Sequence, residues 1–148
     1  MEFSVPSWSP TTLIQDINIL ESIQIKAVNM ISGLRGNSYN EKLRELEMQS
    51  LETRRRRFDL IQVYKIMNNL VNVNSSQWFQ KVSDTNIRNT RQTADLLALV
   101  IPRTKTSNRQ SFFSIRAAEY WNSLPSDIRN AANLSQFKNK LDDYLPSL

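Results

Sequence analysis

The stretch from Ser50 to Leu70, SLETRRRRFDLIQVYKIMNNL, decides the fold of this chain. Its apolar residues recur every three or four positions, which is typical of one side of an α-helix. The stripe consists of Leu60, Val63, Tyr64, Met67 and Leu70. The pattern therefore predicts a helix over about 51–70.

Four consecutive arginines, Arg54 to Arg57, open this helix. Successive residues turn by about 100°, so the four side chains fan around the helix and form no flat basic face. Arg56 falls on the stripe side under Leu60, and Arg55 falls beside Asp59 on the opposite side. We expect the four arginines to lie mainly on a solvated face of the helix. The alternatives are that some of them contact phosphate, or that Arg56 points inward and pairs with a carboxylate. Acidic neighbours would weaken a phosphate field, and they are Glu45, Glu47, Glu52 and Asp59.

Helical patterns recur along the rest of the chain. They predict a first helix over about 11–32, ended by Gly33 and Gly36, and a short second helix opened by the Ser38–Glu41 capping box. Further helices are expected over 111–123 and 135–145, with a turn at 124–127 that restarts a helical stretch. The expected fold is mainly α, a bundle of five to six helices.

One segment has strand character. Residues 94–101, ADLLALVI, form an apolar run ended by Pro102, with a helix as the alternative. We expect at most a small two-stranded β element near 96–113. The chain then divides into a helical part over 1–72, a basic and largely irregular connector over 73–110, and a C-terminal helical part over 111–148.

Composition narrows the chemistry. The 148 residues include no cysteine and no histidine, which argues against disulfides, zinc sites, thiol nucleophiles and the commonest general base. No apolar run approaches the ~20 residues of a membrane span, and the N-terminus has no signal-peptide pattern. We expect an intracellular protein, cytoplasmic or nuclear, with no cofactor, no metal, no small-molecule ligand and no membrane partner.

The formal net charge of +5 is unevenly distributed. Residues 81–116 carry seven basic and two acidic residues, whereas the arginine run is nearly balanced by its acidic neighbours. Basic groups spread beside aromatic ones are typical of grooves that follow a nucleic-acid backbone; the alternative is a basic loop beside core aromatics. The candidate phosphate contacts are Arg88, Arg91, Arg103, Lys105, Arg109 and Arg116. Their aromatic neighbours are Trp78, Phe79, Phe112 and Phe113.

Two other features have mainly structural interpretations. The adjacent Asp142 and Asp143 could suggest a magnesium site, but they lie in a helical pattern without a third carboxylate motif, so we expect a solvated face. The segment Trp121–Pro125, WNSLP, is expected to form a packed corner between helices, with base stacking as the minor alternative. No phosphate-binding loop or nucleophile elbow is present.

Taken in order, these pieces resemble the C-terminal region of reverse transcriptases from animal non-LTR retrotransposons of the jockey-like group. The resemblance runs from about Glu2 to Tyr144. In its first half it rests on Trp8-Ser9-Pro10, Asp16-Ile17, Leu20-Glu21, Gln24, Ala27, Gly33-Leu34, Ser38-Tyr39, Leu43, Leu46, Ser50-Leu51-Glu52, Arg54-Arg55, Asp59-Leu60-Ile61 and Tyr64-Lys65. In its second half it rests on Thr90-Arg91, Phe112-Phe113-Ser114-Ile115-Arg116, Trp121-Asn122, Leu124-Pro125, Phe137-Lys138 and Leu141-Asp142.

The resemblance implies thumb and post-thumb sequence of an RNA-directed DNA polymerase, and contact with template, primer or element RNA. The family's palm hairpin with its two catalytic aspartates is not found in this chain, so we expect a non-catalytic fragment, such as a truncated copy of a mobile element. The expected partner is RNA or an RNA–DNA hybrid, bound weakly and without sequence preference. The alternatives are a protein–protein or self-association module acting through the first helix, and a pseudogene product without selected function.

Overall fold

The computed structural model describes residues 4–9, 14–85 and 95–145. Within these ranges the chain is mainly helical, and no strand is present. Five helices span seven or more residues: α2 (Ile14–Asn29), α3 (Tyr39–Glu45), α4 (Leu51–Met67), α7 (Phe113–Ser123) and α9 (Leu134–Tyr144). Four are single turns: α1 (Val5–Trp8), α5 (Ser75–Trp78), α6 (Ser107–Gln110) and α8 (Ser126–Arg129). The 3₁₀ turns are η1 (Ser32–Leu34) and η2 (Val82–Asp84). The expected helical bundle is confirmed.

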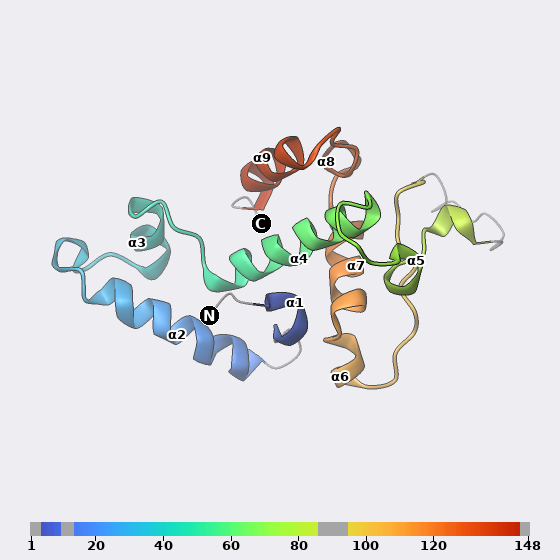
Figure 1. Cartoon of the computed structure of the whole chain (residues 1–148). Coiled ribbons are helices and arrows are strands. Elements are labelled where there is room, and N and C mark those ends of the chain that lie inside the picture. Colours follow the sequence, from blue (N-terminus) through green and yellow to red (C-terminus); the bar gives the residue numbers. More distant parts are fainter. Residues whose placement is uncertain (1–3, 10–13, 86–94, 146–148) are drawn as a thin grey trace.

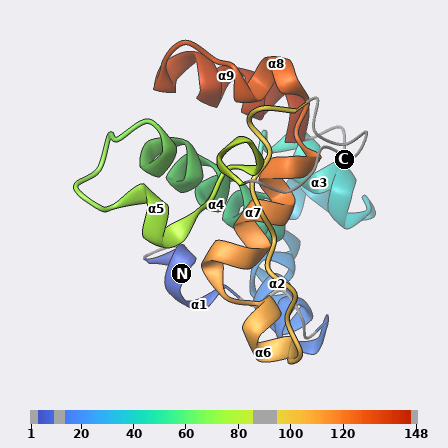
Figure 2. The same cartoon turned by 90° about the vertical axis from the view of Figure 1, so that its right-hand side faces the viewer.

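Helix α4 is the central element, as its position in Figure 1 shows. It contacts α1, α2, α7 and α9. Figures 1 and 2 both place α8 and α9 above it, and α7 crosses it near its C-terminal end. Because neighbours surround α4, apolar side chains beyond the predicted stripe are also buried, among them Ile61 and Ile66. The main core cluster takes residues from α4, from the connector and from the C-terminal helices.

Local signals set the helix ends. At the start of α3, the backbone N–H of Ser38 donates to Glu41 Oε2 at 2.7 Å, and the backbone N–H of Glu41 donates to Ser38 Oγ at 3.4 Å. This reciprocal pair is the predicted capping box. Gly36 has a φ of +93°, a backbone conformation that side chains with a Cβ rarely adopt. These groups separate α2 from α3 with a sharp turn.

The expected β element near 96–113 is replaced by a single antiparallel bridge between Lys81 and Leu99. The two backbone hydrogen bonds around it join Val82 to Ala98 and Val100 to Gln80. On its other side, Leu99 pairs with a side chain: its N–H donates to Asn122 Oδ1 and its carbonyl accepts from Asn122 Nδ2, both at 2.8 Å. An asparagine amide therefore takes the place of a further strand on that side of Leu99, and the optional two-stranded element does not form within the described residues.

The arginine run is also arranged differently from the expectation. Arg55 and Asp59, expected on the solvent side of the helix, are both buried, because α1 and α7 cover that side of α4. Arg56 lies over the Tyr120 ring, with its guanidinium carbon 4.6 Å from the ring centroid. Arg57 forms an ion pair with Asp142 that joins α4 to α9. The run therefore binds neighbouring helices and is not simply a solvated face.

Candidate nucleic-acid interface

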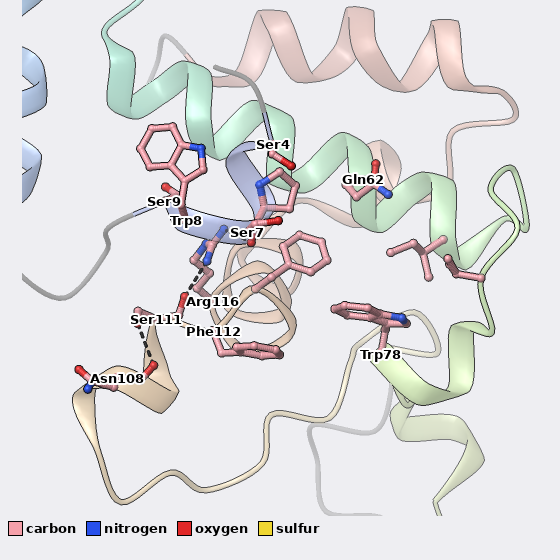
Figure 3. Close-up of a pocket in the computed structure, with 14 residues that line it drawn as sticks. Ser4, Ser7, Trp8, Ser9, Gln62, Trp78, Asn108, Ser111, Phe112 and Arg116 are labelled. Atoms are coloured by element: carbon pink, nitrogen blue, oxygen red, sulfur yellow. Dashed lines mark hydrogen bonds between the residues drawn. The ribbon is translucent and has the colours of Figure 1, made fainter. Parts of the chain in front are cut away.

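An open cleft of about 650 Å³ lies between α1, α4, α5 and the α6–α7 corner. Figure 3 shows its labelled residues converging from these elements. Four aromatic side chains line it: Trp8, Trp78, Phe112 and Phe113. Serines, Gln62 and Asn108 supply the polar groups, and no carboxylate lines the part of the cleft that the structure describes. The cleft is thus apolar and aromatic, with neutral hydrogen-bonding groups around it.

The aromatic residues divide into a buried support and exposed faces. Phe113 is buried and makes edge contacts with Trp78 and Phe79, at ring-centroid distances of 5.9 and 5.7 Å. Trp78 is 39% exposed and Phe112 is 46% exposed, although both lie in the cleft. Phe113 therefore fixes the position of Trp78, while Trp78 and Phe112 offer ring surface to a ligand.

Arg116 lies at the inner end of the cleft but does not reach the solvent, because it is buried. Its guanidinium donates to both carboxylate oxygens of Asp59, at 2.8 and 3.1 Å. It also donates to the carbonyls of Ser111, Val5 and Pro6 at 2.6, 3.2 and 3.0 Å. Arg116 thereby attaches α1 to α7 and shapes the cleft. The hydrogen bonds of its guanidinium all go to protein atoms, so Arg116 is unsuited to the phosphate contact expected from the sequence.

Burial dominates the titration of the carboxylate beside Arg116. Removal from water raises the pKa of Asp59, and the hydrogen bonds from Arg116 and the nearby charges of Arg116 and Arg55 oppose that rise. Two arginines thus face one carboxylate in the interior. This arrangement is typical of a structural ion-pair cluster rather than of an acid–base catalyst.

The exposed basic residues stand at the α6 side of the cleft. Arg109 lies in α6 with its guanidinium carbon 4.9 Å from the centroid of the Phe112 ring. Arg103 and Lys105 are exposed on the irregular segment that leads into α6. No aspartate or glutamate occurs between Asp95 and Glu119, so the charge of these three residues has no acidic neighbour in sequence.

The structure thus brings together only part of the predicted set. Arg103, Lys105 and Arg109 share one segment beside the cleft, Arg116 is internal, and Arg88 and Arg91 lie outside the described residues. Sequence reasoning missed Trp8, which is far away in the chain and enters the cleft through α1. In the sequence, Trp8 was noted only as part of the Trp8-Ser9-Pro10 motif of the family resemblance, and that motif does not predict where Trp8 lies in the fold.

The other sequence candidates have structural roles. Trp121 is buried, and its indole N–H donates to the carbonyl of Leu97 at 2.9 Å, which confirms the packed corner. Asp142 pairs with Arg57, and no group of three potential metal ligands occurs among the residues that the structure describes. No described helix has the length and apolar character required to cross a membrane.

Comparisons with known proteins leave the class of protein open. No family model matches the chain, and neither a curated protein nor a solved structure matches it.

Proposed function

We propose that this chain is a non-catalytic nucleic-acid-binding fragment related to the C-terminal region of jockey-like reverse transcriptases. It binds single-stranded RNA, or the unpaired end of an RNA–DNA hybrid, weakly and without sequence preference. The aromatic cleft takes unstacked bases, and the segment from Arg103 to Arg109 follows the phosphates. The polymerase origin rests on the sequence resemblance alone.

One observation supports the binding proposal above the others: exposed aromatic faces and unbalanced positive charge meet at Phe112. Its ring is 46% exposed in the cleft, and Arg109 lies over it. Every base has a face that can stack, so aromatic platforms bind single strands with little sequence preference, at roughly 1–3 kcal/mol per base. A nearby guanidinium adds phosphate contact and stacking of its own.

The size of the cleft suits this ligand. A volume of about 650 Å³ falls within the range of roughly 300–1,000 Å³ that is usual for small-ligand sites. One or two nucleobases between Trp78 and Phe112 would occupy it. The neutral side chains of Gln62, Asn108 and Ser111 can donate to or accept from any base edge, which is consistent with weak sequence preference.

Tryptophan fluorescence provides a direct binding assay. Of the three tryptophans, Trp121 is buried, whereas Trp8 and Trp78 line the cleft with exposed surface. Titration with oligo(U), oligo(A), a duplex RNA and an RNA–DNA hybrid with an unpaired end should quench the signal for single strands and the tailed hybrid first. Quenching by the duplex alone would contradict stacking in the cleft.

Matched variants separate stacking from charge. Phe112→Leu removes the platform but keeps an apolar side chain, and Arg109→Gln removes one charge. Each should weaken binding about tenfold. Arg35→Gln is the charge-matched control, since Arg35 is exposed beside η1, which lies between α2 and α3 and away from the cleft (Figure 1).

Salt dependence tests the phosphate contacts. Three contacts to a single strand predict a slope of about −2 for the logarithm of the affinity against the logarithm of the salt concentration. Arg109→Gln should lower this slope, and Phe112→Leu should leave it unchanged. Absence of binding at low salt, or affinity that does not change with salt, would overturn the proposal. Extension of a primer on a primed template in the presence of divalent metal would overturn the proposal that the chain is non-catalytic.

A further inference from the structure

The side of α2 that faces away from the molecule carries large apolar residues. Ile19 and Ile23 in α2 are 62% and 43% exposed, and Met30, which directly follows the helix, is 85% exposed. At 100° per residue Ile19 and Ile23 lie about 40° apart around the helix and form a short apolar row. The opposite side, with Gln24 and Val28, is buried. Figure 1 shows α2 at the edge of the molecule, with α3 and α4 on one side only.

Two opposite charges lie beside this apolar row. Asp16 precedes it near the start of α2, and Lys26 lies close to its far end. Both are exposed, and neither forms an ion pair with any residue that the structure describes. An exposed apolar row flanked by unpaired charges of opposite sign is complementary to a second copy of the same helix that runs in the opposite direction.

We propose that α2 pairs with α2 of a second copy of this chain in an antiparallel, two-fold symmetric arrangement centred at the level of Glu21. In that register residue i faces residue 42 − i of the partner. Ile19 then faces Ile23 of the partner subunit, and Asp16 faces Lys26 of the partner subunit. This register therefore brings the isoleucines of the two copies into contact and also forms two Asp16–Lys26 ion pairs, one at each end of the interface.

Other pairings do not meet these two conditions together. A parallel pair would set Asp16 against its own copy and Lys26 against its own copy, which repel. A foreign helix would need the same pattern, whereas a second copy supplies it automatically, as two-fold interfaces require. The interface consists of one helix from each copy, so association is weak. It lies away from the aromatic cleft, so this proposal is independent of nucleic-acid binding.

Charge exchange tests the register in the full chain. Sedimentation equilibrium over a range of concentrations should show a concentration-dependent dimer for the natural sequence. Asp16→Lys alone and Lys26→Asp alone should each weaken dimerisation by about tenfold, because attraction becomes repulsion at two places. The double variant Asp16→Lys with Lys26→Asp should recover dimerisation. An equimolar mixture of the two single variants should form a heterodimer, because both contacts are then attractive.

The apolar row needs its own test. Ile23→Asn should abolish dimerisation, and Ile14→Asn, on an exposed isoleucine of α2 that lies outside the row, is the matched control. The helical circular dichroism signal should stay unchanged for each variant, which shows that a loss of dimerisation is not caused by unfolding. Since the chain has no cysteine, a mixture of Ile19→Cys and Ile23→Cys should cross-link on mild oxidation. A monomer at all concentrations, or single and double charge variants that dimerise equally, would overturn the proposal.

Discussion

Arg116 in α7 and Asp59 in α4 form an ion pair with two hydrogen bonds in the interior, between residues far apart in the sequence. The same guanidinium donates to the carbonyls of Val5 and Pro6 and so attaches α1 to this pair. One side chain thus holds three segments together at the inner end of the aromatic cleft.

Loss of one partner should therefore be costly. Arg116→Met leaves the buried Asp59 without its main partner, and we expect a loss of about 3–5 kcal/mol in the free energy of unfolding. Urea denaturation measures this. In a double-mutant cycle, Asp59→Asn with Arg116→Met should cost less than the sum of the single changes by about 1 kcal/mol or more.

The ion pair of Arg57 and Asp142 is the matched comparison, because Asp142 is partly exposed. Asp142→Asn should cost less than about 1 kcal/mol. Equal costs for Arg116→Met and Asp142→Asn would contradict the central role of the buried pair.

Asn122 should be required for the ordered connector. Its amide makes both hydrogen bonds to the backbone of Leu99, in place of a strand. Asn122→Ala leaves these backbone groups without a partner, at a cost of about 1–3 kcal/mol. Amide hydrogen exchange should show reduced protection at Leu99. Asn139→Ala, at an exposed position of α9, is the control and should change neither quantity. Unchanged exchange at Leu99 would contradict this role.

The two glycines of the chain should respond differently to alanine. Gly36 has a φ of +93°, so Gly36→Ala introduces backbone strain of roughly 1–3 kcal/mol. Gly33 has ordinary backbone geometry and nothing within 4 Å of the position of a new Cβ. Gly33→Ala should be neutral or stabilising, by about 0.4–1 kcal/mol at most. Thermal unfolding of both variants checks the difference, and similar melting temperatures would contradict it.

The capping box should make stability depend on pH. Hydrogen bonds from the hydroxyl and backbone N–H of Ser38 hold the pKa of Glu41 below its ordinary value of 4.5. A lowered pKa in the folded state means that Glu41 stabilises the protein above its unfolded pKa, and that this contribution is lost as the pH falls through the folded pKa.

Glu41→Gln isolates the charge, because glutamine can keep the hydrogen-bonding role of a capping box. Urea denaturation at several pH values should show a difference between the natural protein and Glu41→Gln at neutral pH that shrinks in acid. Ser38→Ala, which removes the hydroxyl, should cost about 0.5–2 kcal/mol. Stability curves that stay parallel down to low pH would contradict the contribution of the Glu41 charge.

Much of the helix pattern could be predicted from the sequence. Predicted helices over 51–70, 111–123 and 135–145 correspond to α4, α7 and α9 within a few residues. Their signals are local: apolar spacing, capping side chains and turn residues act within one or two helical turns. The Trp121 corner was predicted for the same reason.

The strand-like run of 94–101 could not be placed by such signals. Its bridge partner, Lys81, lies well before it in the chain, and the side chain that completes the pairing, Asn122, lies well after it. Long-range pairings of this kind depend on where the fold places the Lys81 backbone and the Asn122 side chain. The periodicity of residues 94–101 carries no information about these positions.

The candidate site was predictable only in part. The acid-free basic segment with Arg103, Lys105 and Arg109 can be recognised in the sequence, because charge composition is local. Trp8 and Phe112 line one cleft because Arg116 of α7 binds the backbone of α1, which brings these distant segments together.

The sequence by itself determined the approximate bounds of the longer helices, and where the positive charge accumulates, because caps, glycine conformation and residue spacing act over a few neighbouring residues. Only the tertiary structure decided which arginines are buried. Arg55 and Arg116 share the interior with Asp59, whereas Arg109 stays exposed over Phe112. The physical reason is that a buried guanidinium is stable only where a carboxylate and backbone carbonyls meet it, and these come from distant segments.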